Sequence, residues 1–192
     1  MLNGYRAMNL LTGNRLQKLR QLLAEKGIDA ILISQPENRY YLSGFDGSAG
    51  FVLITSQKAI LATDFRYVEQ SKRQAPDYET LRITGDVGDW FPAMVSELKL
   101  RRLGFEAGHV TFAMHQRLSD ILNRAQSQLE LMPLEGLVES LRAIKEPEEV
   151  ELITKAVEMA DNAFEYIEGM LHIGMREKEV AWEIEKFIRE NG

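Results

Sequence analysis

Short apolar runs alternate with amphipathic stretches along the first two thirds of the chain, and this alternation limits the possible folds. The stretch Asn14–Lys26 carries leucines at helical spacing, and it ends at Gly27, a residue type suited to a left-handed helix C-cap. The run Asp29–Ser34 is short and apolar, which is typical of a buried strand. Helices interleaved with strands predict a mixed α/β sandwich over residues 14–134.

The remaining segments of this region continue the alternation. Pro92 falls in an expected helix and can be accommodated only in the first turn of that helix. Arg39–Ser43 and the two strands joined by the polar turn Thr55–Lys58 are expected to form a three-stranded meander. The expected strands are Arg39–Ser43, Phe51–Thr55, Ala59–Ala62, Tyr78–Ile83, Arg102–Glu106 and Leu129–Met132. The expected helices are Phe65–Arg73, Trp90–Leu98 and a helix through Ala125 that Thr111 would cap.

The pattern changes after Pro133, because no strand signal occurs from Glu146 onward. Pro147 suits the first turn of a long helix, and a second amphipathic helix follows the break at 172–174. Two such helices without a sheet leave apolar faces uncovered, so the sequence predicts a second domain over 135–192 that is cut off at its end. The apolar stripe of the long helix is Val150, Ile153, Val157, Ala160, Phe164, Ile167 and Leu171.

Composition excludes several classes of function. The net charge of -6 and the pI near 5.2 provide no basic surface, which argues against a nucleic-acid partner. The absence of cysteine excludes disulfides, thiolate metal sites and a cysteine nucleophile. No apolar run approaches the roughly 20 residues that span a bilayer, and Met1–Gly13 is interpreted as an N-terminal extension rather than a signal peptide. We therefore expect a cytoplasmic protein without a membrane partner.

The segment Ser43–Gly50 has glycine at every third position and lies between two expected strands. It lacks the spacing of a dinucleotide fingerprint and the lysine of a P-loop. Two interpretations remain open. The glycines satisfy a turn that needs positive φ and close backbone approach, or the segment is a rim loop that shapes a pocket.

Asp64, Arg66 and Tyr67 follow directly on the strand that ends at Thr63. A strand end is a common place for site residues, but an Asp–Arg pair is also an ordinary helix N-cap, which we favour. No serine lies in a G-x-S-x-G motif, so a nucleophile elbow is absent. The histidines, none of which has a metal-site spacing, are His109, His115 and His172. The residues alone therefore indicate no catalytic constellation.

Three stretches, taken together and in this order, resemble the aminopeptidase P family of Xaa-Pro aminopeptidases, with prolidase and creatinase as relatives. They are Arg39–Gly50, Ala62–Gln70 and Leu141–Ile153. The third stretch resembles the entry into the catalytic "pita-bread" domain of that family. The second departs from the family's TDGRY pattern at Phe65, where glycine is more usual.

The resemblance implies a fold and a chemistry. For 14–134 it implies a three-layer, mixed-sheet sandwich of the creatinase/prolidase N-terminal type, with a ribonuclease H-like motif. For 135–192 it implies the linker and first helices of a truncated metallopeptidase domain. The family uses two divalent metals (manganese, cobalt or zinc) to cleave the bond before proline. Their ligands are expected after residue 192, so no catalytic residue and no metal ligand maps onto this chain.

The resemblance also implies that this domain forms dimer or tetramer contacts and restricts the length of peptides with proline second. The candidate pocket residues, all near the glycine-rich segment, are Tyr41, Phe45, Asp46, Arg66 and Tyr67. Two alternatives remain: a non-catalytic peptide- or protein-binding module of the same fold, as in certain histone chaperones, and a creatinase-like amidinohydrolase.

Overall fold

The computed structural model describes residues 2–192, with side chains from Thr12 onward. The chain divides into two compact units, residues 1–143 and 144–192. The first helix, α1 (Leu2–Glu25), begins well before the predicted Asn14. Of the predicted N-terminal extension, Met1 and the side chains up to Leu11 lie outside the described residues. Along the described residues, no helix combines the length and the apolar character needed to cross a membrane.

The first unit is built on a six-stranded mixed sheet with the order β4-β3-β2-β1-β5-β6. β2 pairs antiparallel with β1 and β3, while β1 with β5, β5 with β6 and β3 with β4 are parallel. Every strand except β2 therefore points the same way. The strands are β1 (Ala30–Ile33), β2 (Phe51–Thr55), β3 (Ala59–Thr63), β4 (Glu79–Arg82), β5 (Arg102–Glu106) and β6 (Glu130–Leu134).

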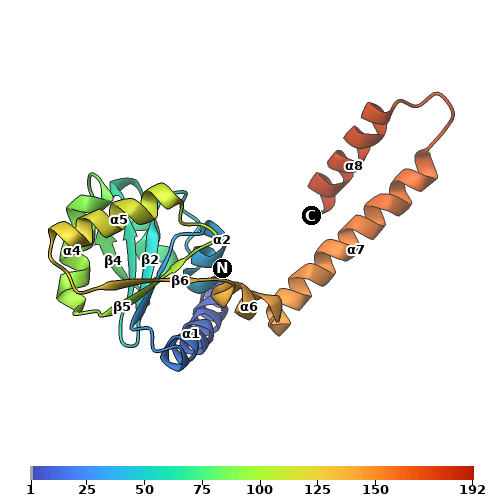
Figure 1. Ribbon diagram of the computed structural model, residues 1–192. Helices are drawn as coiled ribbons and strands as arrows, with labels where there is room; N and C mark the ends of the chain where they lie inside the picture. Colours follow the sequence, from blue (N-terminus) through green and yellow to red (C-terminus); the bar gives the residue numbers. More distant parts are fainter. Residues whose placement is uncertain (1) are drawn as a thin grey trace. The chain divides into compact units, whose positions relative to one another are not determined.

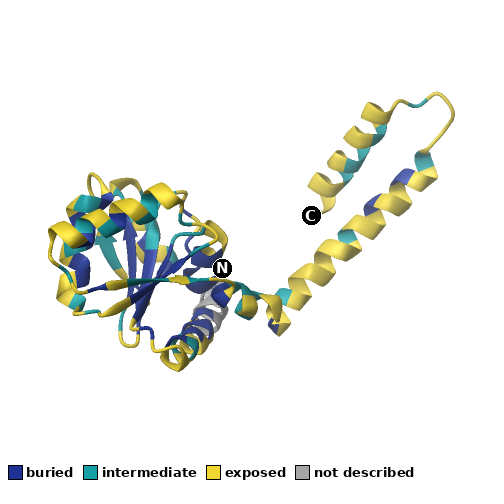
Figure 2. Ribbon diagram, viewed as in Figure 1, coloured by how far each residue is buried: buried dark blue, intermediate teal, exposed yellow. Residues whose placement is uncertain are grey.

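Helices cover both faces of this sheet, which makes a three-layer sandwich (Figures 1 and 2). Successive strand side chains point to opposite faces, so Ile31 and Ile33 join one buried cluster while Ala30 and Leu32 join the other. The first cluster is closed by α1, α2 (Pro36–Ser43) and α6 (Leu137–Ala143). The second is closed by α4 (Val87–Leu98) and α5 (Phe112–Arg124). The predicted mixed-sheet α/β sandwich is thus confirmed.

The predicted strand Arg39–Ser43 is wrong, because this segment belongs to helix α2. Pro36 occupies the first helical turn, where its fixed φ and missing N–H are tolerated. Gly44 ends the helix in the left-handed region, and its N–H donates to the Tyr40 carbonyl over 2.7 Å. The expected three-stranded meander is consequently a hairpin of β2 and β3, with β1 on the other side of β2.

Two prolines also lie elsewhere than predicted. Pro92 sits inside α4 rather than in its first turn, because Asp86 and Asp89 form a capping box that starts the helix earlier, at Val87. Pro133 lies within β6 instead of ending it. β6 is an edge strand, where a proline without an N–H donor is tolerated.

The second unit is a pair of helices, α7 (Pro147–Met170) and α8 (Glu177–Asn191), as the sequence predicted. Tyr166 and Phe187 stack between them at a ring separation of 4.9 Å. Much of the predicted apolar stripe on α7 remains exposed, including Val150 and Phe164. The first unit reaches Ala143 and includes α6, which packs on α1 and α2, whereas the sequence placed a boundary near residue 135.

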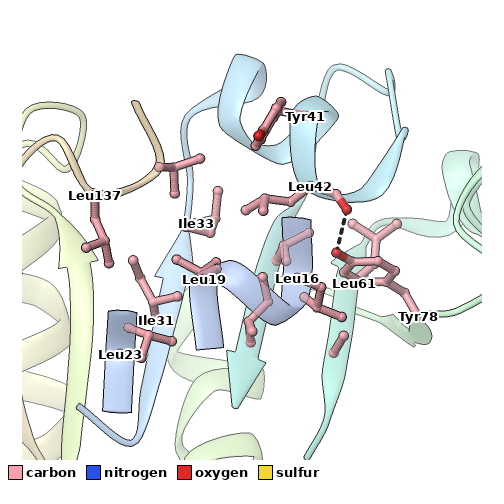
Figure 3. Close-up of a cluster of buried hydrophobic side chains, with 14 of the residues drawn as sticks. Leu16, Leu19, Leu23, Ile31, Ile33, Tyr41, Leu42, Leu61, Tyr78 and Leu137 are labelled. Atoms are coloured by element: carbon pink, nitrogen blue, oxygen red, sulfur yellow. Dashed lines mark hydrogen bonds between the residues drawn. The ribbon is translucent and has the colours of Figure 1, made fainter. Parts of the chain in front are cut away.

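Tyr78 makes a buried hydrogen bond that predicts a loss of stability at alkaline pH. Its hydroxyl donates to the Leu42 carbonyl over 2.8 Å, as Figure 3 shows. Burial raises the pKa of the Tyr78 phenol, so the unfolded chain ionises this group first, and the stabilisation is lost as pH rises above about 10. In urea titrations, Tyr78→Phe should cost about 1 kcal/mol at pH 8. Between pH 8 and 11 the variant should lose less stability than the wild type; equal losses would contradict the prediction.

Candidate functional site

The candidate site lies at the end of the sheet that is formed by the carboxyl ends of the parallel strands. We call this end the carboxyl edge. β1, β3, β5 and β6 all reach this edge with their carboxyl ends, and the loop Gly44–Gly50 crosses it before β2. We call this segment the glycine loop. In α/β sheets, ligands commonly bind outside the carboxyl ends of the strands. The segments singled out from the sequence therefore meet at a functionally plausible edge.

Two of the three glycines in the glycine loop have the positive φ predicted for this segment, and the third, Gly47, allows the close approach. Gly44 and Gly50 have φ values of 73° and 149°, which side-chain-bearing residues rarely adopt. A Cβ at Gly50 would lie 2.9 Å from the Ala62 carbonyl oxygen, and one at Gly47 would overlap the ring of Phe45. The glycines thus allow the loop to lie directly on its neighbours.

Side chains join the glycine loop to the segment that follows β3, which comprises the short 3-10 helix η1 (Phe65–Tyr67) and α3 (Val68–Gln74). The hydroxyls of Ser48 and Tyr67 lie 2.7 Å apart. The Asp46 carboxylate accepts a hydrogen bond from Gln70 Nε2 over 2.5 Å. The Phe45 and Tyr67 rings meet edge to face with centroids 6.0 Å apart. The candidates Asp46 and Tyr67 therefore lie on one rim, with Phe45 fully buried beneath it.

Arg66 and Asp64 form the N-cap that we favoured from the sequence. Asp64 Oδ1 accepts from the Arg66 backbone N–H over 2.9 Å, and the Arg66 guanidinium lies 2.7 Å from Asp64 Oδ2. The hydrogen bond from Arg66 lowers the pKa of Asp64, and the same contact raises the pKa of Arg66. Arg66 also lies 5.3 Å from the Tyr67 ring, which places it on the rim. Because Arg66 is exposed and Asp64 is only partly buried, the pair contributes little stability.

Tyr41 does not join the other candidates. It is buried in the first cluster, which α1, α2 and α6 close, and Figure 3 draws it among the side chains of this cluster. The Arg15 guanidinium lies 4.1 Å from its ring and donates to its carbonyl. Tyr41 lies apart from the rim because it belongs to helix α2, whose turn directs its side chain toward the core.

Sequence reasoning missed Arg39, which lies beneath the glycine loop. Arg39 is buried, and its Nη1 donates to the Gly50 carbonyl over 2.6 Å while its Nη2 donates to the Gly47 carbonyl. The sequence did contain a signal for the location of Arg39. Pro36 and Gly44 mark the two ends of a helix, and a helix would have placed Arg39 next to the start of the loop.

A second polar group at the same edge is centred on Glu106, the last residue of β5. Its carboxylate accepts from the backbone N–H groups of Ser34 and Gln35 over 2.6 and 2.7 Å, and from Asn38 Nδ2 over 2.7 Å. The buried Asn38 amide also accepts from Arg142 over 2.9 Å. We call this set the Glu106 network. It ties β5, α2 and α6 together.

A pocket of about 270 Å³ adjoins the Glu106 network, with Gln35, His109 and Glu139 in its lining. His109 Nδ1 lies 2.8 Å from the Ser34 hydroxyl. Among the side chains that the structure describes, no group of three or more histidines and carboxylates is placed to hold a metal ion. The two-metal centre implied by the resemblance therefore does not fit the described residues. The edge instead offers hydrogen-bonding groups and a rim of aromatic and charged side chains.

Comparison with known proteins identifies related domains. Residues 15–144 match the creatinase/prolidase N-terminal domain family. The chain is 37% identical to an uncharacterized peptidase, YqhT, of Bacillus subtilis over 93% of its own length and 49% of that protein. It is 29% identical to an Xaa-Pro dipeptidase of Pyrococcus furiosus, again over 93% of its own length and 49% of the relative. The chain thus spans about half the length of these relatives.

Solved structures give the same result. An Xaa-Pro dipeptidase from Bacillus anthracis matches with a TM-score of 0.83 and 38% identity, over 94% of this chain and 50% of that one. The N-terminal domain of the cytoplasmic peptidase PepQ from Mycobacterium tuberculosis matches with a TM-score of 0.61 and 39% identity. This second match covers 67% of the chain and 98% of that domain.

Proposed function

Because the chain belongs to the creatinase/prolidase N-terminal domain family, we propose that it is the non-catalytic, N-terminal part of a metal-dependent Xaa-Pro aminopeptidase or dipeptidase. The observation that carries this proposal is the alignment of nearly the whole chain with one half of proteins described as Xaa-Pro dipeptidases. In this proposal, residues 135–192 are the linker and first helices of the catalytic domain. The two divalent metals, manganese, cobalt or zinc, are bound by residues outside this chain.

The role proposed for this domain is to contact other subunits of a dimer or tetramer and to limit the length of the bound peptide. The rim supports this role, because Asp46, Arg66 and Tyr67 stand at the carboxyl edge of the sheet and are joined to one another or to neighbouring elements. A cytoplasmic location is part of the proposal, supported by the related domain from a peptidase described as cytoplasmic.

The test compares the full-length protein with the 192-residue chain. Both are incubated with Mn²⁺, Co²⁺ or Zn²⁺ and with matched peptides that carry proline or alanine second, and release of the first residue is measured. We expect the full-length protein to cleave only the proline peptides and to lose this activity with a chelator. The shorter chain should show no turnover above background.

Other outcomes would replace the proposal. Cleavage of proline peptides by the shorter chain would show that the active site lies within it. Binding of peptides by the full-length protein without cleavage would favour the binding module. Hydrolysis of creatine but not of proline peptides would favour the amidinohydrolase.

A further inference from the structure

A single buried cation holds the glycine loop. The Arg39 side chain extends from α2 beneath the loop and is only 3% exposed. It donates to two carbonyls of the loop, those of Gly47 and Gly50, and its Cζ lies 5.6 Å from the centre of the Phe45 ring. The planar guanidinium reaches the two carbonyls from two separate nitrogens held in a fixed geometry, whereas a lysine ammonium carries all of its donors on one flexible nitrogen. One side chain therefore fixes three positions of the loop.

Burying the charged Arg39 side chain costs free energy. Among the described residues its Nε has no hydrogen-bond partner. Burial lowers the pKa of the Arg39 guanidinium, and the more distant carboxylates of Glu106 and Glu37 act in the opposite direction. A buried charge without a directly bonded carboxylate is a weak way to stabilise a domain. The buried arginine at residue 39 is better explained by the conformation that its two hydrogen bonds impose on the glycine loop.

The other attachments of the glycine loop hold different positions from those that Arg39 holds. The loop is not part of the sheet, and side chains bond three of its carbonyl groups. At Asp46, the carboxylate accepts from Gln70 and the backbone N–H donates to Gln74. The Thr63 hydroxyl donates to the Ala49 carbonyl over 2.7 Å, and Ser48 meets Tyr67 at the rim. The carbonyls of Gly47 and Gly50 are bonded by Arg39.

The base from which Arg39 extends is itself fixed. Its neighbour Asn38 belongs to the Glu106 network, which attaches α2 to β5 and, through Arg142, to α6. α2 is also closed at its end by the left-handed Gly44. A rigid base with a two-pronged donor is the arrangement that holds a loop in one conformation before a ligand arrives.

We propose that Arg39 is a positioning residue, which holds the glycine loop and, through Phe45 and Ser48, sets the rim that contacts the peptide. The peptide part of this proposal rests on the proposed function. We call the two hydrogen bonds from Arg39 to the Gly47 and Gly50 carbonyls the clamp. The clamp lies within this domain and can be tested without any substrate.

The first experiment measures backbone hydrogen exchange in the 192-residue chain with Arg39→Met and Arg39→Lys. Peptides covering 44–50 should exchange about tenfold faster in the methionine variant, and less so in the lysine variant, which retains one donor group. Exchange of β1 and β2 should change little. Arg20→Met is the matched control, because Arg20 also donates to a carbonyl, that of Thr55, at the opposite edge of the sheet.

The outcomes are decisive. Faster exchange confined to the loop in the Arg39 variants, but not in Arg20→Met, supports the clamp. Unchanged loop exchange in Arg39→Lys and Arg39→Met overturns it. If the Arg39→Met variant is globally unfolded, the loop exchange of Arg39→Lys decides between these outcomes, because lysine keeps the charge and most of the side-chain length.

The second experiment uses the full-length protein and a proline-containing tripeptide. Arg39→Lys should raise KM severalfold and leave kcat within about twofold, since the variant disturbs binding and not the reacting atoms. Unchanged KM beside faster loop exchange would overturn the link to the peptide. If the wild-type protein does not cleave proline peptides while loop exchange still rises, the proposed function fails and the clamp stands.

Discussion

Replacing Phe45 with alanine is expected to lower the free energy of unfolding by about 3–5 kcal/mol, the range for a fully buried phenylalanine. Phe45 is completely buried, packs edge to face against Tyr67, and lies under Gly47 with no room for a further carbon atom. Although the sequence suggested it as a pocket residue, its first effect should be on stability. Phe45→Leu, which preserves most of the buried volume, should lose much less.

Phe65→Ala is the control for this prediction, because it makes the same change in the neighbouring segment. Phe65 is 68% exposed, so its loss should alter stability by no more than about 0.5 kcal/mol. Urea titrations of both variants, followed by circular dichroism, provide the measurement. Equal losses for the two variants would show that Phe45 is not part of the core.

Replacing Glu106 with alanine is the second change with a large expected effect, again about 3–5 kcal/mol. Its carboxylate is the acceptor for the N–H groups of Ser34 and Gln35 and for the Asn38 amide. Asn38 also donates to Glu139 over 2.7 Å, so the loss falls mainly on the half-buried N–H groups of Ser34 and Gln35. A buried donor left without an acceptor costs about 1–3 kcal/mol, and water from the adjoining pocket can compensate only part of this. Glu106→Gln keeps one oxygen and should lose about 2 kcal/mol.

Glu130→Ala is the control, since Glu130 is exposed and forms a surface ion pair with Arg102 at 3.3 Å. Its loss should change stability by less than about 1 kcal/mol. Chemical denaturation of the three variants at one pH and salt concentration makes the comparison. A Glu106→Ala variant as stable as Glu130→Ala would mean that the network contributes no net stability.

Much of the sheet could be predicted from the chain, and the failures have a common cause. The strands β1, β2 and β3 have compact apolar runs, and each lies where it was expected. The segment Arg39–Ser43 has residues that suit a strand equally well. Its conformation is decided by Pro36 and Gly44 at its ends and by the core that receives Leu42. Local composition was a weaker guide there than the residues that start and stop a helix.

The candidate site was predictable in part. Asp46, Arg66 and Tyr67 were selected because they stand beside the glycines or after a strand, and the structure places them on one rim. Tyr41 was selected in the same way, but a helical turn directs it into the core. Arg39 and Glu106 were not selected, because their importance arises from contacts with residues distant in the chain.

The sequence by itself determined the α/β class, the glycine positions that need positive φ, and the long amphipathic helix after Pro147, because each follows from local spacing or from one residue's backbone freedom. Only the tertiary structure decided which polar side chains are buried and what they bind. Asn38 meets Arg142 although 104 positions separate them in the chain, and Ser34 meets Glu106 across 72. Such contacts depend on which strands become neighbours in the sheet, and no local pattern encodes that pairing.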